Sequence, residues 1–470
     1  MQTNARRQGR LTWSRGPLLA GGLAGLLLAV TLAVLPTAAA QDDPPVVFEG
    51  ARLIPGDGSA PVDDSAFVVR NGRIQELGAR TALRAPRGAR RVDLRGTSVM
   101  PLIIDVHGHI GYMKDGTTGA AQYSRENVLD HLRRYLYYGV GAMQSLGTDR
   151  NDVELWIRNE QQAGTLKDPD LALLFTAGQG LVAPTPGQAN GGPAFAPDVV
   201  HETISPDDGR QFVRALAIKK PDIVKVWVDD RNRTKVKLAP ELYRPIIDEA
   251  HAQGLRAVAH VYYLDDAKEL ARAGVDGFAH MVRDRPLDDE ALRLFKARDL
   301  FACTTMSVQR GDGAAWIDDP ALAETVQRDV IAKWKSTLSQ SGPRPVPPGY
   351  AVLEDSARKL HAAGVRMVLC GDTGFAMQVP GFTEHRELKG LVDAGIPPLE
   401  AIRIATHAGA AVLGLADRGS LARGKRADFM VLEGDPIADI TNSRRIRAVY
   451  RDGRAVDRAA ARARWNGTAR

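Results

Sequence analysis

The sequence predicts an α/β protein whose main part is a (β/α)8 TIM barrel, and two observations support this prediction. Between about residues 98 and 418, short apolar segments with the length of buried strands alternate with segments that have the pattern of amphipathic helices. Several of the apolar segments end in a histidine, a lysine or an aspartate, and barrel enzymes carry their reactive groups at the carboxyl ends of the strands. The expected helices include residues 125–138, 240–253, 264–273 and 356–363.

Residues 1–40 have the pattern of a secretory signal peptide. Four arginines precede an apolar run from Leu18 to Leu35, and small residues follow up to Ala40. We expect cleavage after Ala40 and a periplasmic or secreted protein without stable membrane association; a retained leader would instead act as a membrane anchor. Four of the 62 basic residues lie in this leader, so the rest of the chain carries 58 basic residues against 56 acidic ones. This balance gives no support for nucleic-acid binding.

The two ends of the remaining chain, residues 41–97 and 419–470, contain short strand-like segments with turn signals between them. Asn71-Gly72 is a strong signal for a hairpin turn. These ends therefore form a part separate from the barrel. Their strand-like segments are residues 66–69, 74–77, 428–432 and 446–450.

The first strand of the predicted barrel ends in two histidines. The apolar run from Val99 to Ile104 leads into Asp105-Val106-His107-Gly108-His109. Side chains at positions i and i+2 of an extended chain point to the same side, so both imidazoles can reach one metal ion. A His-X-His pair alone is a weak signal, because such pairs also occur in ordinary turns.

Four further candidate residues each close an apolar segment of the barrel. A lysine between buried-strand residues has to be neutralised, paired or modified, because burying an unpaired ammonium is costly. Taken singly, such a histidine is more often a core residue and such a lysine a salt-bridged one. The histidine pair and these four residues together make five candidate metal-binding positions, which follow one another on successive strand ends. This order favours one shared metal site. The four residues are Lys225 in residues 222–228, His260 at the end of 255–260, His280 at the end of 274–280, and Asp372 after 365–371.

This series resembles the metal-binding motifs of the amidohydrolase superfamily, in its imidazolonepropionase-like and prolidase-like branch. The stretch from Ala405 to Leu415, followed by residues 419–421 and 424–429, resembles the closing signature of that family. The resemblance covers nearly all of the chain after the first 45 residues. It implies that residues 41–97 and 419–470 combine into one β-sandwich beside a metal-dependent TIM-barrel amidohydrolase domain at residues 98–418.

The resemblance also implies a centre with two divalent metal ions per chain. Lys225, N-carboxylated by carbon dioxide, would bridge the ions, and Asp372 would be the general acid and base. Histidine and carboxylate ligands suit zinc best, with manganese, cobalt and iron as alternatives. Some relatives work with a single ion, so the number of ions stays open. The expected ligands are His107, His109, Lys225, His260, His280 and Asp372.

The loop after the lysine strand departs from the pattern of prolidase-like relatives, which usually have Ser-Gly-Gly or Thr-Gly-Gly there. Residues 229–233 of this chain read Asp-Asp-Arg-Asn-Arg. Asp229 or Arg231 would contact a charged end of the substrate, or the two would pair with each other at the rim of the pocket; we favour the pairing.

Three further residues follow the histidine strands, where family members often place substrate contacts: Tyr262, Tyr263 and Arg283. Arg283 either binds a carboxylate of the substrate through two hydrogen bonds or forms a salt bridge with Asp284 or Asp288. The Gly- and Pro-rich residues 178–198 are expected to form a loop over the barrel mouth.

From these residues we expect an exported hydrolase that cleaves an amide-type C–N bond of a small-molecule substrate, such as a dipeptide, an N-acyl amino acid or a cyclic amide. The alternatives are an ester, lactone or phosphoester hydrolase on the same site, or a non-catalytic metal-binding scaffold. Relatives often form dimers and larger assemblies, which leaves a homo-oligomer open.

The chain contains two cysteines, Cys303 and Cys370, and each lies in a strand-like segment. Export would permit a disulfide between them. We nevertheless expect two unpaired small core residues, because both positions are apolar in pattern.

Overall fold

The computed structural model of the chain describes residues 44–185, 190–310, 315–340 and 348–467. All described residues lie in one compact unit, which extends over residues 43–470. The predicted signal peptide and its cleavage site lie outside the described residues. Among the described residues, no helix has both the length and the apolar character that crossing a bilayer requires.

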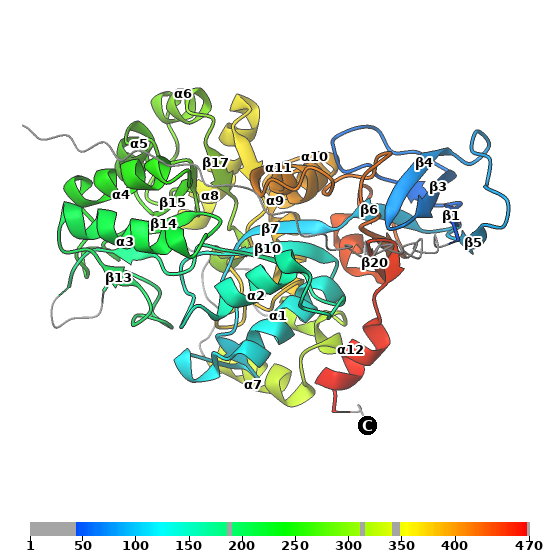
Figure 1. Cartoon of the computed structure of the whole chain (residues 1–470), viewed down its shortest axis with the longest axis horizontal. Coiled ribbons are helices and arrows are strands. Elements are labelled where there is room, and N and C mark those ends of the chain that lie inside the picture. The colour runs from blue at the N-terminus through cyan, green and yellow to red at the C-terminus, as the bar shows by residue number, and fades with distance from the viewer. Residues whose placement is uncertain (1–43, 186–189, 311–314, 341–347, 468–470) are drawn as a thin grey trace, which may run out of the picture. The chain divides into compact units, whose positions relative to one another are not determined.

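Two parallel sheets form the centre of this unit (Figure 1). The smaller sheet has the strand order β11-β10-β7, and the larger has the order β13-β12-β14-β15-β16-β17-β18; all pairings within both sheets are parallel. The strands are β7 (Ile103–Gly108), β10 (Val140–Ser145), β11 (Leu173–Thr176), β12 (Leu181–Val182), β13 (His201–Glu202), β14 (Val224–Val228), β15 (Ala257–Val261), β16 (Gly277–Phe278), β17 (Phe301–Cys303) and β18 (Arg366–Val368).

Backbone hydrogen bonds join the two parallel sheets to each other on both sides. On one side, the amide of Val106 in β7 donates to the carbonyl of Leu369, which follows β18, at 3.0 Å. On the other side, the amide of Asp222 donates to the carbonyl of Thr176 in β11 at 2.9 Å. The first strand of the series is therefore a direct neighbour of the last.

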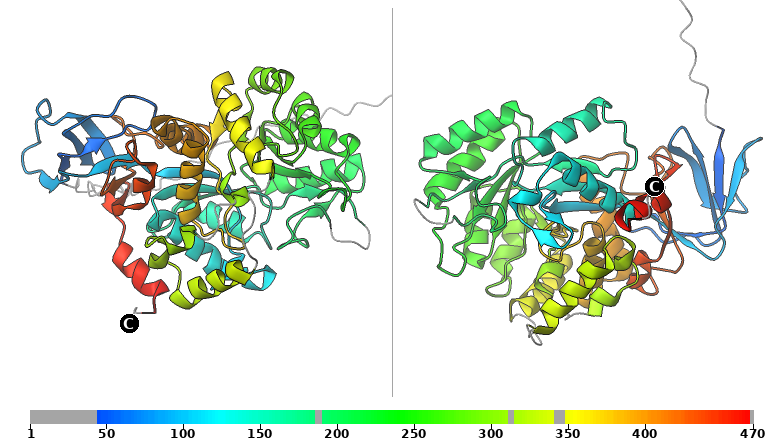
Figure 2. Two further views of the ribbon diagram at one scale, coloured as in Figure 1. Left: turned by 180° about the vertical axis from the view of Figure 1, so that it is seen from behind. Right: turned by 90° about the horizontal axis from the view of Figure 1, so that it is seen from below.

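Helices follow most of these strands and lie outside them in the views of Figure 2. Polar caps start several of them: Ser124 accepts a hydrogen bond from the amide of Asn127 at the start of α1, and Ser205 caps α3 in the same way. The helices are α1 (Arg125–Tyr137), α2 (Val153–Ala163), α3 (Pro206–Ile218), α4 (Pro240–Ala252), α5 (Leu264–Arg272), α6 (Asp289–Ala297), α7 (Arg328–Gln340), α8 (Pro348–Ala363), α9 (Phe382–Asp393), α10 (Pro398–Arg403), α11 (Gly409–Val412) and α12 (Arg458–Trp465).

The four helices predicted from the sequence are all present in the structure. α1, α4 and α5 each begin at the predicted residue and end one residue early, whereas α8 begins eight residues before the predicted start, at Pro348. Short helical turns complete the chain: η1 (Ala120–Gln122), η2 (Ser307–Gln309), η3 (Ala315–Asp318), η4 (Leu322–Glu324), the π-helical η5 (Ile404–Ala408) and η6 (Ile440–Arg444).

Two further sheets are built from the chain ends. One has the order β4-β3-β1-β5, and the other has the order β2-β6-β19-β20-β21, so residues near both ends share a sheet. The strands are β1 (Val46–Glu49), β2 (Arg52–Leu53), β3 (Ser65–Arg70), β4 (Arg73–Ala79), β5 (Arg90–Asp93), β6 (Ser98–Pro101), β19 (Phe429–Leu432), β20 (Ile446–Arg451) and β21 (Arg454–Ala455); β8 (Met113–Lys114) and β9 (Thr117–Thr118) form a separate hairpin.

The predicted hairpin at Asn71-Gly72 is confirmed. Both residues have positive φ, 51° and 73°, as a tight turn between β3 and β4 requires. Aromatic side chains from the two end sheets pack together: the ring centroids of Phe48 and Phe429 lie 5.0 Å apart, and those of Phe67 and Phe429 lie 5.1 Å apart.

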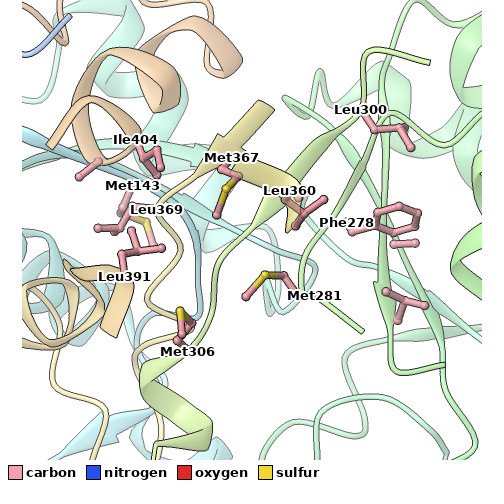
Figure 3. Close-up of a cluster of buried hydrophobic side chains, with 14 of the residues drawn as sticks. Met143, Phe278, Met281, Leu300, Met306, Leu360, Met367, Leu369, Leu391 and Ile404 are labelled. Carbon is pink, nitrogen blue, oxygen red and sulfur yellow. The ribbon is translucent and has the colours of Figure 1, made fainter. Parts of the chain in front are cut away.

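A large apolar core lies between the parallel strands and their helices. Figure 3 shows part of it, from Met143 of β10 to Leu391 of α9 and Ile404 of η5. A second apolar cluster contains Ile104 and Val106, whose side chains lie on the other face of β7 from that of Ile103. Both faces of this strand are therefore buried, as expected for a parallel sheet.

The two cysteines form a disulfide in the structure, so the expectation of unpaired core cysteines is wrong. Cys303 ends β17 and Cys370 follows β18, and their Cα atoms lie 5.3 Å apart. Both side chains are fully buried, as predicted. The pairing of β17 with β18 places the two residues on neighbouring strands and allows the bond.

Candidate metal centre

His107, His109 and Asp372 form a compact group of metal-ligand side chains. Nε2 of His107 lies 3.5 Å and Nε2 of His109 lies 3.4 Å from the carboxylate of Asp372. One ligand atom from each residue lies within 4.8 Å of the other two, and all three residues are buried. This is the only such group of three or more metal-ligand residues among the described parts of the chain.

Backbone contacts between the end of β7 and the segment that follows β18 hold this group together. The amide of Asp372 donates to the carbonyl of His107 at 2.8 Å, and the amide of His109 donates to the carbonyl of Thr373 at 2.7 Å. Asp372 has a φ of 48°, a conformation that costs a residue with a side chain about 1–3 kcal/mol. The surrounding hydrogen bonds fix this conformation and aim the carboxylate at the two histidines.

Hydrogen bonds also set the orientation of the two imidazoles. Nδ1 of His107 donates to the carbonyl of Ala279 at 3.0 Å, and Nδ1 of His109 lies 3.0 Å from the hydroxyl of Thr148. Nε2 of His107 is buried and has no hydrogen-bond partner among the described residues. The lone pair on Nε2 of His107 is thus available to a ligand, which is the arrangement that a metal requires of its histidines.

Lys225, His260 and His280 come to the same place from neighbouring strands. Lys225 lies in β14, His260 lies in β15, and His280 follows β16. The ring of His280 lies 4.9 Å from that of His107 and 4.5 Å from that of His260, centroid to centroid. Nζ of Lys225 and Nδ1 of His280 are buried without a hydrogen-bond partner among the described residues.

Burial favours the neutral forms of three of the histidines and of Lys225. It lowers the pKa of His107 and His280 well below the usual histidine value and that of His260 to about 3. Burial also lowers the pKa of Lys225 to about 7, although the charge of Asp372 opposes this change. Neutral imidazoles and a neutral amine are the forms that bind a metal and react with carbon dioxide, respectively.

The carboxylate of Asp372 stays ionised at neutral pH. Burial alone would raise its pKa, but the adjacent His107 and His109 hold the pKa of Asp372 well below its usual value. The site therefore combines one anionic oxygen donor with nitrogen donors, and some of these nitrogens lack a hydrogen-bond partner within the described parts of the chain. These donors fit a divalent cation.

Asp229 and Arg231 pair with each other, as the preferred interpretation of the loop had it, but Asp229 is not at the rim. Nη1 of Arg231 lies 3.1 Å from the carboxylate of Asp229. Asp229 is buried, with 3% of its surface exposed, and accepts a hydrogen bond from Nε2 of His260 at 2.8 Å. The loop is thus attached to the centre itself through His260.

Among the three predicted contacts after the histidine strands, only Arg283 lines a cavity at the centre. Tyr263 donates its hydroxyl hydrogen bond to Asp230 at 2.7 Å, and the ring of Tyr262 lies 5.1 Å from the Arg283 guanidinium. The alternative salt bridge of Arg283 is not formed, because Asp284 pairs with Arg285. Asp288, the other residue considered, pairs with Lys268.

This cavity has a volume of about 640 Å³ and a mostly apolar lining. The segment predicted to cover the barrel mouth contributes residues from Asn190 to Pro197, which agrees with the expected position of that loop. His109, His260, His280 and Asp372 line the cavity together with Thr118, Asn190, Gly192, Pro193, Ala194, Phe195, Pro197, Trp227, Arg231, Lys235, Arg283, Val308, Phe375 and Ala376.

A second group of residues beside the centre was not predicted. Asp105 accepts hydrogen bonds from the amides of His107, at 3.1 Å, and Gly371, at 3.0 Å. The hydroxyl of Thr373 donates to the buried Glu384 at 3.2 Å. Burial raises the pKa of Asp105 to about 7 and that of Glu384 well above its usual value. The available signal was an aspartate inside an apolar strand, two residues before His107.

A model of the amidohydrolase family matches residues 98–456 of this chain. This match covers more than half of the sequence, and the chain belongs to the amidohydrolase family, which confirms the resemblance of its motifs. It is therefore an enzyme, a hydrolase that acts on carbon–nitrogen bonds.

Solved structures of similar fold include several hydrolases. A Xaa-Pro dipeptidase crystallised with methionine in its active site is 20% identical, with 87% of this chain and 99% of that chain covered and a TM-score of 0.66. The A. niger ochratoxinase is 21% identical, with coverages of 91% and 98% and a TM-score of 0.67. Phenylurea hydrolase B is 21% identical, with coverages of 88% and 97% and a TM-score of 0.69. A comparison with curated proteins gives no match.

Proposed function

We propose that this protein is an exported, metal-dependent amidohydrolase that cleaves an amide-type C–N bond in a small molecule such as a dipeptide, an N-acyl amino acid or a cyclic amide. The observation that carries the proposal is the convergence of His107, His109 and Asp372 at one end of a cavity that His260 and His280 also line. The family membership and the fold of an amide-cleaving Xaa-Pro dipeptidase support it.

The ligands divide into two sets in this proposal. His107, His109 and Asp372 would hold one divalent ion, and His260 and His280 would hold a second. Bound there, the metal would lower the pKa of a water molecule and polarise the carbonyl of the substrate. Zinc is the ion that we expect.

Lys225 would bridge the two ions as an N-carboxylated residue. Its neutral Nζ forms a bond with the carbon of carbon dioxide and loses one proton to solvent, which turns a neutral amine into an anionic carbamate. The burial of Nζ, its lack of a described hydrogen-bond partner and the lowered pKa of Lys225, about 7, support this reaction.

Asp372 would act as the general acid and base. Its ionised carboxylate accepts a proton from the attacking water and delivers that proton to the leaving nitrogen, so the amine departs neutral. Its position supports this role, since it contacts both His107 and His109 and also lines the cavity. The hydrogen bonds of its backbone keep the carboxylate in place between the two transfers.

For the fold, we propose that the parallel strands close into a (β/α)8 barrel at residues 98–418. The backbone hydrogen bonds on both sides of the two sheets support closure. Residues 41–97 and 419–470 would form one β-sandwich, which the packing of Phe48 and Phe67 against Phe429 supports.

We further propose export through a signal peptide at residues 1–40, to the periplasm or the medium, without stable membrane association after cleavage. The disulfide between Cys303 and Cys370 supports this location, because such bonds persist in oxidising compartments. We include a homo-oligomer in the proposal because other members of the family often form dimers and larger assemblies.

The experiment that tests the proposal combines metal analysis with a substrate panel on the purified mature chain. Two equivalents of metal, and release of an amino acid from dipeptides or N-acyl amino acids that stops on chelation and returns with added metal, are the expected results. Turnover of esters, lactones or phosphoesters alone would replace the amide assignment. Bound metal without turnover of any class would show a non-catalytic scaffold.

A further inference from the structure

Arg283 carries a buried charge without a counter-ion. Only 9% of its surface is exposed. Its polar contact among the described residues is a long hydrogen bond, 3.4 Å, from Nη2 to the carbonyl of Val261, and the ring of Tyr262 lies 5.1 Å from the guanidinium. None of the ion pairs between described residues includes it, because Asp284 and Asp288 pair with other residues.

A guanidinium that is buried without a counter-ion lowers the stability of the ligand-free protein. An arginine at the centre of a fold normally pairs with a carboxylate, since desolvation without compensation costs several kcal/mol. Burial accordingly lowers the pKa of Arg283 from its usual value. Because the side chain lines the cavity, a ligand inside the cavity can supply the missing anion.

The charges around the cavity favour an anionic ligand. Arg231, Lys235 and Arg283 line it, whereas Asp372 is the only carboxylate in the described lining. The Arg231 charge is already compensated by Asp229 at 3.1 Å. Arg283 is therefore the cation in the cavity that combines deep burial with the absence of an ion-pair partner among the described residues.

Another part of the lining is aromatic. The rings of Phe195 and Phe375 stack with centroids 4.9 Å apart and an angle of 15° between planes. Phe195 also contacts the ring of His109, at 5.3 Å, so this pair lies next to the metal ligands. Trp227 completes what we call the aromatic wall, namely Phe195, Trp227 and Phe375.

We propose that the substrate carries a free carboxylate, which Arg283 binds, and an apolar group, which packs against the aromatic wall. The inference rests on the proposed amide hydrolysis and narrows its substrates to N-acyl amino acids and dipeptides with an apolar acyl or side-chain group. A guanidinium can bind a carboxylate through two parallel hydrogen bonds, and a site built for that contact rejects analogues that lack it. Cyclic amides without a carboxylate are then poor substrates.

The test uses matched pairs of compounds that share the scissile bond. Each N-acyl amino acid, for example N-benzoylglycine, is compared with its uncharged carboxamide and with the less apolar N-acetyl compound, using the metal-loaded protein. We expect the carboxylate member with the larger acyl group to have the highest kcat/KM. Arg283→Gln should raise the KM for this carboxylate compound by about 30-fold or more and leave its kcat nearly unchanged. The kcat/KM for the matching carboxamide should not change, because that compound has no carboxylate for Arg283 to bind.

Arg285→Gln is the matched control. This neighbouring arginine forms a surface pair with Asp265 and does not line the cavity, so KM should not change. A merely structural role of Arg283 would lower the Tm of the ligand-free protein on substitution. We expect Arg283→Gln to leave that Tm unchanged or raise it, because it removes an uncompensated charge.

Thermal shifts separate failure of this inference from failure of the proposed function. N-benzoylglycine should raise the Tm of the wild type and not that of Arg283→Gln, whether or not it is hydrolysed. That result without turnover would retain the carboxylate site and reject amide hydrolysis. Equal kcat/KM values for the carboxylate and carboxamide compounds, or an unchanged KM in Arg283→Gln, would overturn the inference. The proposed amide hydrolysis would still stand in either case.

Discussion

The carboxylate of Asp229 accepts a hydrogen bond from Nε2 of His260 at 2.8 Å. This contact assigns the proton of the imidazole to Nε2 and leaves the lone pair on Nδ1. Burial alone would raise the pKa of Asp229, but His260 and Arg231 lower it to about 2, so the partner is anionic at neutral pH. An anionic acceptor behind a metal-ligating histidine fixes its tautomer and increases its basicity.

Asp229→Asn should therefore weaken metal binding. The asparagine keeps the shape of the side chain and loses its charge, and we expect metal affinity to fall by about 10- to 100-fold, as measured by competition with a chelator. Asp230→Asn is the control, because Asp230 bonds to Tyr263 and not to a proposed ligand. Equal metal retention by both variants would contradict the role given to Asp229.

Lys225→Ala should abolish turnover and lose metal, because it removes the proposed bridging carbamate. Wild-type protein grown with ¹³C-bicarbonate should show a carbamate carbon signal that is absent from the variant. Added short carboxylic acids should restore part of the activity, since they supply an anion of similar size. A fully active Lys225→Ala protein with two metals bound would exclude the carbamate.

The pKa of Lys225 also predicts how the stability of the metal-free protein depends on pH. The folded pKa, about 7, lies below the ordinary lysine pKa of 10.5, so between these values the unfolded chain binds more protons than the folded one. Lys225 therefore makes the free energy of unfolding rise with pH across this window. Lys225→Met should remove that rise and be more stable than the wild type at neutral pH in chemical denaturation. Identical pH profiles would show that Lys225 is not buried as an amine.

Asp372→Asn should lower kcat by about 100- to 10,000-fold, the range expected for loss of a general acid and base. Its amide oxygen can still act as a ligand, so most of the metal should stay bound. Metal content measured beside the rate distinguishes this outcome from collapse of the site. A variant with normal kcat would place the proton transfers on another group.

Loss of the disulfide should destabilise the protein. The bond joins residues separated by 67 positions, and a loop of that length corresponds to about 4 kcal/mol of chain entropy in the unfolded state. Cys303→Ala, Cys370→Ala and the double variant should lose similar amounts in denaturant unfolding, since each breaks the same bond. Two free thiols in protein purified from an exporting host would contradict the pairing.

The sequence predicted the strand ends and the residues on them because both depend on local patterns. Apolar runs placed β7, β14 and β15, and the polar residue that interrupts or closes each run stands out against them. The alternation of apolar strands with amphipathic segments located α1 and α4 within one residue at each end. Asn71-Gly72 specified its turn because positive φ at two successive residues limits the choice of amino acids.

Several contacts between distant segments could not be predicted from the sequence, because they depend on which strands are neighbours and on the register of their pairing. Asp229 reaches His260 because β14 pairs with β15 so that Trp227 lies opposite His260. The disulfide likewise depends on the pairing of β17 with β18. The stacking of Phe195 on Phe375 joins two loops, and neither loop has a periodic pattern that would reveal the contact.

The direct hydrogen bonding of β7 to the segment after β18 determines when the centre can form. The amide of Gly371 bonds to Asp105, 266 positions earlier in the chain, and Asp372 meets His107 only through the same pairing. A nascent chain still being synthesised has the two histidines but lacks their aspartate until residue 372 of the 470 has been made. Metal uptake by this triad must therefore follow synthesis of Asp372, and a chain truncated before residue 372 would never acquire the triad.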